Sequence, residues 1–256
     1  MYTLGIDIGS TTSKCAVLKD GKELVARSLQ TGGLGTGGPE EALAQLWQTS
    51  GLTRADMACA FVTGYGRKNY EGADGEISEL TAHALGGRFV FPDLRTVIDI
   101  GGQDAKVIAL SPSGKMVNFV MNDKCAAGTG RFLEVMANTL SLRPNEMFEL
   151  ARLGSDTTIS SMCTVFAESE VIGLIGKGEP KENIAYAVVD STIRKVAAQV
   201  SRMNGEMSTF CLTGGLCECE YIREALSKKL GKEVISSPDA RYAGAIGAAL
   251  SAMKIR

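Results

Sequence analysis

The sequence predicts an α/β protein made of two similar lobes that face a cleft. Three observations support this fold class: a strand–turn–strand pattern that occurs twice, an acidic residue at the first turn of each copy, and glycine at the tight turns. A chain of 256 residues suffices for one large domain or for two small domains packed together. We place the first lobe at residues 1–94 and the second at residues 95–256, and expect the C-terminal helix to be able to pack back on the first lobe.

The repeat consists of "YTLGIDIGSTTSKCAVLKDGKELVARSL" at residues 2–29 and "RTVIDIGGQDAKVIALSPSGKMVNFVM" at residues 95–121. In each copy an apolar strand ends in Asp-Ile-Gly, turns tightly and returns as a second strand, and a glycine-containing turn leads to a third strand. The positions that match between the copies are Asp7 with Asp99, Gly9 with Gly101, and Lys14 with Lys106.

The tight turns of both copies have the composition of phosphate-binding loops. Glycine has no Cβ, so its backbone approaches a phosphate closely and reaches positive φ angles. Hydroxyl, amide and ammonium groups around the glycines add donors, which predicts a nucleotide site. Its expected contacts are Ser10, Thr11, Thr12, Ser13 and Lys14 in the first copy and Gly101, Gly102 and Gln103 in the second. We expect Asp7 and Asp104 to hold Mg²⁺, directly or through water, and to position the attacking water.

Four further segments complete the expected fold. "FCLTGGL" at residues 210–216 reads as a buried strand running into Gly214 and Gly215, a third place where backbone can approach a nucleotide. The other segments are a loop at 31–41 before a helix around 40–50, a core helix at 183–203 with apolar residues at helical spacing, and a helix of small residues at 236–253.

Composition limits the classes of function. Hydrophobic residues make up 45% and charged residues 22% of the chain, as in ordinary globular proteins, and the net charge is −2. This charge argues against nucleic acid or an anionic membrane as a partner. No apolar run reaches the roughly 18 residues that a membrane span needs. The N-terminus lacks a basic region, so we expect no signal peptide and a cytoplasmic location.

Two of the seven cysteines stand directly before helical runs. Cys125 precedes a turn made of Gly128, Thr129 and Gly130, and Cys163 precedes "TVFAESEVIGLI". A helix N-terminus presents unpaired N–H groups and a partial positive charge, which stabilise an anion such as a thiolate. These residues alone leave three alternatives open: buried thiols, a catalytic cysteine, or ligands of an iron–sulfur cluster.

The remaining candidate metal ligands are expected to be structural. Cys15 and Cys211 lie on apolar strands, and Cys217 and Cys219 could bind zinc only with partners elsewhere in the chain. The single histidine, His83, excludes sites built on several imidazoles and is expected in the core or in solvent.

The motifs resemble those of a known superfamily and, more specifically, those of one family within it. The Asp-Ile-Gly turns and the Thr-Gly-Gly strand end resemble the actin-like (ribonuclease H-like) ATPase superfamily, which includes sugar and acetate kinases. Within it the chain more specifically resembles the ATP-dependent activators of 2-hydroxyacyl-CoA dehydratases, which are cousins of the ATPase subunits of benzoyl-CoA reductase. The stretches that carry this resemblance are "GYGR" (64–67), "DIGGQDAK" (99–106), "NDKCAAGTGRFLEVMA" (122–137) and "CTVFAESEV" (163–171).

This resemblance implies an oxygen-sensitive homodimer with one 4Fe–4S cluster. The cluster would be held by the cysteines that match Cys125 and Cys163, since two per chain in two chains supply the four thiolates that a cubane needs. Reduced ferredoxin or flavodoxin would load it. MgATP, bound in part at Gly128, Thr129 and Gly130, would drive one low-potential electron to a dehydratase that forms a ketyl radical from an (R)-2-hydroxyacyl-CoA.

Some positions depart from the family pattern or leave the function open. "LCECEY" (216–221) and Arg241, where glutamine is more usual, would lie near the adenine or ribose, and Glu134 and Glu168 are expected on solvated helix faces. One alternative function is activation of a related cluster enzyme, either benzoyl-CoA reductase-like or a double-cubane protein. The others are a small-molecule kinase of the same superfamily and an actin-like filament or regulatory module.

Overall fold

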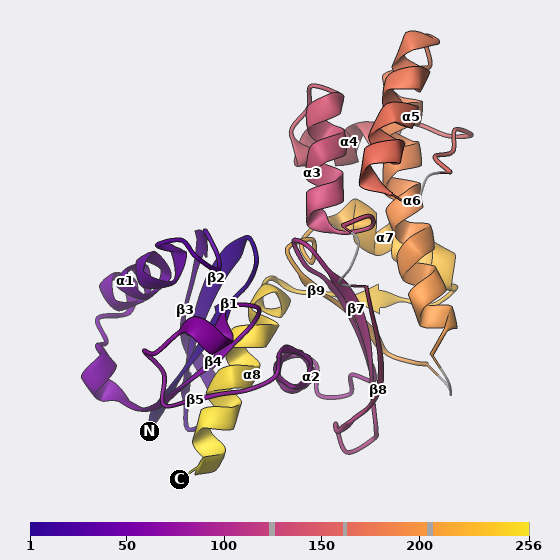
Figure 1. Cartoon of the computed structure of the whole chain (residues 1–256). Helices are drawn as coiled ribbons and strands as arrows, with labels where there is room; N and C mark the ends of the chain where they lie inside the picture. The colour runs from indigo at the N-terminus through magenta and orange to yellow at the C-terminus, as the bar shows by residue number, and fades with distance from the viewer. Residues whose placement is uncertain (123–125, 161–162, 204–206, 256) are drawn as a thin grey trace. The chain divides into compact units, whose positions relative to one another are not determined.

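A computed structural model describes residues 1–122, 126–160, 163–203 and 207–255. The chain divides into two compact units. The first consists of Met1–Val97, Leu110–Val117 and Ser237–Arg256, and the second of Ile98–Ala109 and Asn118–Ser236. Figure 1 shows the elements of each unit, with the N-terminus and the C-terminal segment both in the first. The predicted boundary between residues 94 and 95 stays a prediction.

The first unit is built on a mixed five-stranded sheet. Strand order across it is β3-β2-β1-β4-β5, in which β1 is antiparallel to β2 and parallel to β4. β2 and β3 are antiparallel, whereas β4 and β5 are parallel. The strands are β1 (Tyr2–Ile8), β2 (Thr12–Lys19), β3 (Glu23–Thr31), β4 (Met57–Thr63) and β5 (Gly75–Glu76).

Helices cover both faces of this sheet (Figure 1). Along β2, Cys15 and Val17 pack in one apolar cluster with α1, and Ala16 and Leu18 pack in another with α8, as the alternation of a strand requires. The helices are α1 (Gly38–Ser50), which confirms the predicted helix around 40–50, α2 (Glu79–Val90) and α8 (Ala243–Ala252). Short 3₁₀ turns are η1 (Arg54–Asp56), η2 (Arg67–Asn69), η3 (Pro238–Tyr242) and η4 (Met253–Ile255).

Glycines let α8 lie directly on its neighbours. A Cβ at Gly5 of β1 would stand 1.8 Å from the Ala245 carbonyl oxygen, and one at Gly247 would stand 1.9 Å from the Ala82 carbonyl oxygen. The helix predicted over 236–253 is shorter than expected, because η3 precedes it and the α-helix begins only at Ala243. Pro238, which has no N–H and a fixed φ, stands in the first turn of that 3₁₀ segment.

The second unit repeats the first. Its sheet has the order β10-β9-β6-β7-β8. Read from the other edge, as β8-β7-β6-β9-β10, this order matches that of the first sheet strand for strand. β9 and β10 are parallel, as are β4 and β5. The strands are β6 (Thr96–Ile100), β7 (Ala105–Leu110), β8 (Met116–Asn122), β9 (Phe210–Gly214) and β10 (Val234–Ile235). The predicted α/β class and its internal repeat are therefore confirmed.

Five helices in the described ranges complete the second unit. The longest, α6, confirms the core helix predicted over 183–203, since one side of it is buried and packs against α4 and α7. The Thr139 hydroxyl of α3 donates to the Glu168 carboxylate of α5 over 3.1 Å, so Glu168 joins two helices. The helices are α3 (Gly130–Thr139), α4 (Pro144–Ala151), α5 (Thr164–Gly176), α6 (Lys181–Ser201) and α7 (Glu220–Leu230). Among the described helices, none has the length and apolar character needed to cross a membrane.

Candidate functional site

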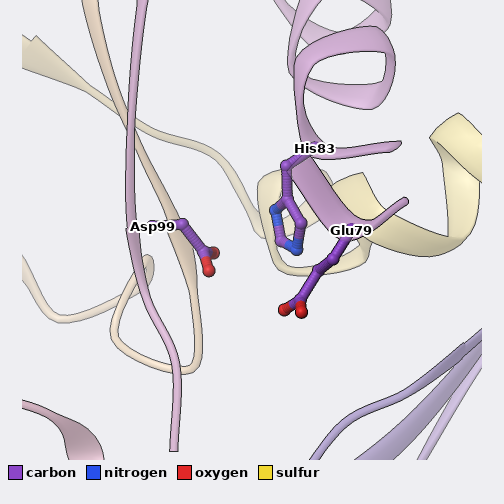
Figure 2. Close-up of side chains that lie close together, drawn as sticks. All are labelled: Glu79, His83 and Asp99. Carbon is purple, nitrogen blue, oxygen red and sulfur yellow. The ribbon is translucent and has the colours of Figure 1, made fainter. Parts of the chain in front are cut away.

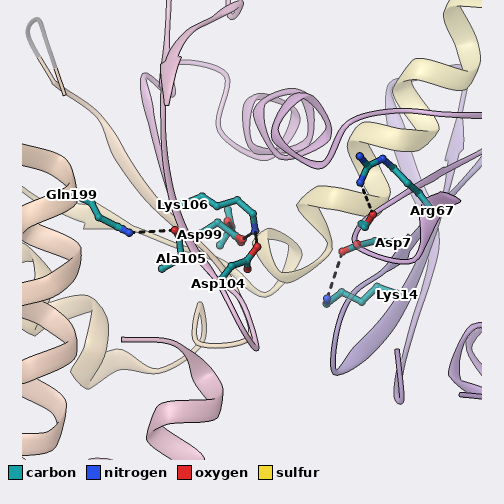
Figure 3. Close-up of polar contacts among 10 residues, drawn as sticks. Asp7, Lys14, Arg67, Asp99, Asp104, Ala105, Lys106 and Gln199 are labelled. Carbon is teal, nitrogen blue, oxygen red and sulfur yellow. Dashed lines mark hydrogen bonds and ion pairs between the residues drawn. The ribbon is translucent and has the colours of Figure 1, made fainter. Parts of the chain in front are cut away.

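In the first unit, an acid and a lysine lie opposite each other where β1 and β2 meet. Asp7 pairs in register with Lys14, and the Lys14 Nζ lies 3.5 Å from the Asp7 Oδ2 (Figure 3). Both side chains are almost fully buried. Because a buried charge is costly unless it is paired, Asp7 and Lys14 stabilise each other at the end of the strand.

The turn between these strands is held by the loop that follows β3. The Gly32 amide donates to the Thr11 carbonyl over 2.8 Å, and the Leu34 amide donates to the Gly9 carbonyl over 3.0 Å. The Ser13 hydroxyl is buried and donates to the Gly32 carbonyl over 2.8 Å. Of the predicted phosphate contacts here, Ser10 and Thr12 are half-buried and Thr11 is exposed.

The end of β4 brings a glycine and a cation to the same place. Gly64 has φ +88°, and a Cβ there would stand 2.5 Å from the Asp7 Oδ1 and 2.4 Å from the Ile8 carbonyl oxygen. The Arg67 Nη1 donates to the Gly64 carbonyl over 2.9 Å (Figure 3). In the sequence, "GYGR" indicates only the family, and nothing in it marks Gly64 and Arg67 as parts of the site.

The other side of Asp7 is formed by α2 and α8. His83 and Glu79 lie one turn apart on α2 (Figure 2), and His83 is buried. A Cβ at Gly244, in the first turn of α8, would stand 2.7 Å from the Asp7 Oδ2 and 3.2 Å from the His83 Nε2. The N-terminus of α8 therefore contributes its partial positive charge beside the Asp7 carboxylate.

The second unit contains the matching acid–lysine group with one more acid. The Lys106 Nζ lies 3.0 Å from the Asp99 Oδ2 and 3.0 Å from the Asp104 Oδ2 (Figure 3). The Lys106 and Asp99 side chains are almost completely buried, whereas Asp104 is 18% exposed. Two carboxylates thus lie at one ammonium, and of the two acids only Asp104 reaches the surface.

The end of β9 repeats the arrangement at the end of β4. Gly214 has φ +84°, and a Cβ there would stand 2.4 Å from the Ile100 carbonyl oxygen and 2.9 Å from the Asp99 Oδ1. The Thr213 hydroxyl donates to the Asp99 Oδ1 over 2.7 Å. Gly64 and Gly214 are thus the same structural position in the two copies, which extends the repeat beyond the matches seen in the sequence.

The N-terminus of α3 is joined to the turn of the second copy. The Gly130 amide donates to the Gly101 carbonyl over 3.0 Å, and the Arg131 amide donates to the Gly102 carbonyl over 2.8 Å. Thr129 is the buried N-cap residue, and Gly128 before it has φ +84°. The structure therefore brings together the predicted residues 101–102 and 128–130 within one unit.

Three other predicted nucleotide contacts form none of the contacts described above. Gln103 and Gly215 are exposed at the turns that follow β6 and β9. Arg241 is half-buried in η3, which belongs to the first unit. Their predicted roles in nucleotide binding stay predictions.

The cysteines fall into two kinds. Cys163 is exposed and is the N-cap residue of α5, where its carbonyl accepts from the Ala167 amide over 2.9 Å. Burial raises the pKa of Cys15 to about 12 and also raises the pKa of Cys211, so these two thiols stay protonated and serve packing. Cys125, the other predicted cluster ligand, lies outside the described residues.

The chemistry of the described groups fits the ions that the sequence predicts. Asp104 is a partly exposed carboxylate, which suits a hard cation such as Mg²⁺ that keeps several waters. Cys163 is an exposed cysteine at the N-terminus of α5, which suits a ligand of a cluster held by cysteines.

Two repeated sheets with an acid, a lysine and a positive-φ glycine at the strand ends define the actin-like fold. A ROK family glucokinase from Streptomyces griseus, solved with glucose and AMPPNP, shares this fold with a TM-score of 0.62 at 15% identity, over 99% of this chain and 100% of that one. The chain belongs to the BadF/BadG/BcrA/BcrD ATPase family, whose model matches residues 4–252. The predicted family resemblance is therefore confirmed.

Members of this family that resemble the chain closely are named dehydratase activators. The (R)-2-hydroxyglutaryl-CoA dehydratase activating ATPase of Acidaminococcus fermentans is 49% identical over 99% of this chain and 98% of its own length. The activator of lactoyl-CoA dehydratase of Anaerotignum propionicum is 47% identical over 98% and 97%. The solved activator of the 2-hydroxyisocaproyl-CoA dehydratase from Clostridium difficile, with bound ADPNP, has a TM-score of 0.94 at 43% identity, over 100% and 95%.

Proposed function

We propose that this chain is an ATP-hydrolysing activator that delivers a low-potential electron to a 2-hydroxyacyl-CoA dehydratase. The observation that carries the proposal is full-length similarity to three proteins named as activators of 2-hydroxyacyl-CoA dehydratases, at 43–49% identity. One of these was solved with an ATP analogue bound, which supports nucleotide binding by the same fold. The duplicated acid–lysine–glycine groups supply the local chemistry for this activity.

The acidic residues of each unit would handle the metal and the water. Asp104 and Asp7 would hold Mg²⁺ through water, and the ion would neutralise phosphate charge when bound. Lys106 lies 3.0 Å from each of two carboxylates and holds Asp104 beside Asp99. The amides of Gly101 and Gly102, with the neighbouring glycines, let phosphate oxygens approach the backbone. Arg67 adds a cation beside Asp7 that can balance charge developing on a transferred phosphoryl group.

Cys163 and Cys125 would hold the iron–sulfur cluster, which supplies one-electron transfer when bound. A 4Fe–4S cluster takes four thiolates, so two such cysteines per chain imply two chains around one cluster. The surface near Cys163 supports a second copy as the other half. Val165 and Phe166 are each 67% exposed and Ile172 is 56% exposed on α5, which is unusual for large apolar side chains and is expected of an interface.

Nucleotide and cluster would be coupled through α3. This helix begins five residues after Cys125, and its first two amides are bonded to the carbonyls of Gly101 and Gly102. A shift of that turn therefore moves α3, and the bond between Thr139 and Glu168 passes the shift to α5. For a one-electron couple, about 1.4 kcal/mol of conformational work corresponds to about 59 mV in potential, so a few kcal/mol change the driving force substantially.

The partners follow from this role. The acceptor would be a 2-hydroxyacyl-CoA dehydratase that carries its own cluster, and the donor would be reduced ferredoxin or flavodoxin.

An assay without oxygen separates the two halves of this function. The chain is mixed with reduced flavodoxin, MgATP and a 2-hydroxyacyl-CoA dehydratase, and both phosphate release and dehydration are followed. Asp104→Asn should lose both activities. Cys163→Ser should lose dehydratase activation and keep ADP binding, whereas Cys59→Ser, which changes a buried cysteine of β4 with no predicted ligand role, should keep both. Dehydratase activation by Cys163→Ser at the wild-type rate would reject the electron-transfer role.

A further inference from the structure

A cavity in the second unit lies between α6 and α7. Its volume is about 520 Å³, within the range that holds small-molecule ligands. None of the single residues predicted from the sequence to bind nucleotide, magnesium or a cluster lines it, although Tyr221 ends the segment 216–221 that is expected near the adenine or ribose. A ligand of this cavity is therefore distinguished from the nucleotide by saturating the nucleotide site first.

Both helices line the cavity with residues at helical spacing. On α6 these are Tyr186, Val189 and Ile193, of which the last two are buried and form an apolar floor. On α7 they are Tyr221, Ala225, Lys228 and Lys229. Because residues three and four apart share one face of a helix, each helix presents an aromatic ring followed by smaller or charged groups.

The ring of Tyr221 is held in place before any ligand arrives. Its hydroxyl donates to the Ala151 carbonyl over 3.1 Å, and the Arg152 guanidinium carbon lies 5.2 Å from the ring centroid. Burial raises the pKa of Tyr221, and the nearby Tyr186 raises it further, so the ring lies in a weakly polar environment next to a second tyrosine. A fixed aromatic surface costs little entropy when a ligand binds to it.

The charges of the cavity leave two cations available. Arg152 lies 2.8 Å from the Glu224 carboxylate, and the Asp190 carboxylate lies 2.7 Å from the Arg194 Nε, so both acids that line the cavity are already paired. Lys228 and Lys229 are exposed at the C-terminal end of α7 and form no ion pair with any residue in the described ranges. An anionic group is therefore favoured at that end of the cavity.

We propose that this cavity binds a small planar aromatic anion, with its ring against Tyr186 and Tyr221 and its carboxylate or phosphate at Lys228 and Lys229. Aromatic rings stack on tyrosine with a gain beyond simple burial, and the ammonium groups give charge-assisted hydrogen bonds. The apolar floor of Val189 and Ile193 excludes water below the ring.

Calorimetric titration of the full chain tests this proposal. The protein is prepared without oxygen and saturated with MgADP, so that the nucleotide site is blocked, and is titrated with 2-naphthoate, 2-naphthyl phosphate and the neutral 2-naphthamide. We expect saturable binding of one or both anions, with one site per chain, and weaker binding of the amide. The stronger anion identifies the acidic group that the site prefers.

Variants assign the binding to the cavity. The double variant Lys228→Gln/Lys229→Gln should lower the affinity for the anion by about tenfold, and Tyr186→Leu should lower it by about fivefold. Arg223→Gln removes a cation from the same helix that does not line the cavity, and should leave the affinity unchanged. Absence of saturable binding, equal binding of anion and amide, or wild-type affinity in the double lysine variant would overturn the proposal.

Discussion

Alanine at Gly64 should destabilise the first unit by a calculable amount. The φ of +88° places any L side chain in a strained conformation, which costs about 1–2 kcal/mol. The added Cβ would also stand 2.4 Å from the Ile8 carbonyl oxygen and 2.5 Å from the Asp7 Oδ1. Overpacking of this kind costs about 1–3 kcal/mol more. We therefore expect Gly64→Ala to lower the free energy of unfolding by about 2–5 kcal/mol.

A matched glycine separates the two costs. Gly35 has φ +78° in the same unit, and a Cβ there would meet nothing within 4 Å. Gly35→Ala should therefore cost only the backbone strain, and the effect of alanine on the unfolded chain is the same in both variants and cancels. The difference between the two variants should be about 1–3 kcal/mol.

The assay uses the single tryptophan of the chain. Trp47 lies on α1, in the first unit, so its fluorescence during urea denaturation follows the unfolding of that unit. The free energy of unfolding is obtained by linear extrapolation for the wild type and both variants. Equal destabilisation by Gly64→Ala and Gly35→Ala would show that Gly64 does not approach Asp7 and Ile8 as closely as described, and would refute the reasoning.

Three other changes test the described groups. Lys106→Met removes the cation between two carboxylates and should lower the free energy of unfolding by about 3–5 kcal/mol in circular dichroism melts, because it breaks a buried ion pair. Lys14 pairs with a single acid over 3.5 Å, so Lys14→Met should lower it by less in the same melts. Arg67→Gln should reduce the rate of phosphate release while the calorimetric affinity for ADP stays within twofold or so of wild type, since the cation acts on developing charge; an unchanged rate argues against that role. Hydrogen bonding by the Ala60 amide and by Arg54 lowers the pKa of Asp74 below its ordinary 3.8, so the carboxylate stabilises the first unit above that pH and this contribution is lost as the pH falls through the lowered pKa. Asp74→Asn should accordingly flatten the acid limb of a stability-against-pH curve, and an unaltered limb would contradict the assignment.

The repeat could be predicted from the sequence because its physical requirements are local. An apolar strand ending in Asp-Ile-Gly needs a glycine at the turn and a charged partner on the returning strand, and both copies retain these residues at the same spacing. The helix over 183–203 could likewise be predicted from the spacing of its apolar residues.

The correspondence between β4 and β9 could not be predicted in the same way. "FVTGYG" (61–66) and "CLTGGL" (211–216) share only a Thr-Gly pair, and nothing in that pair shows that its glycine approaches the acid of another strand. That contact depends on the parallel pairing of β4 with β1, which brings Thr63 beside Asp7. The cavity between α6 and α7 could not be predicted from the sequence either, because its lysines and tyrosines come from two helices that meet only in the folded unit.

The most direct test of the central claim is native mass spectrometry of protein purified without oxygen, with iron and sulfide determined on the same sample. The account predicts a dimer whose mass exceeds two chains by one 4Fe–4S cluster, and loss of that cluster in Cys163→Ser with ADP binding retained. A metal-free monomer in anoxic preparations that still hydrolyse ATP would contradict the account.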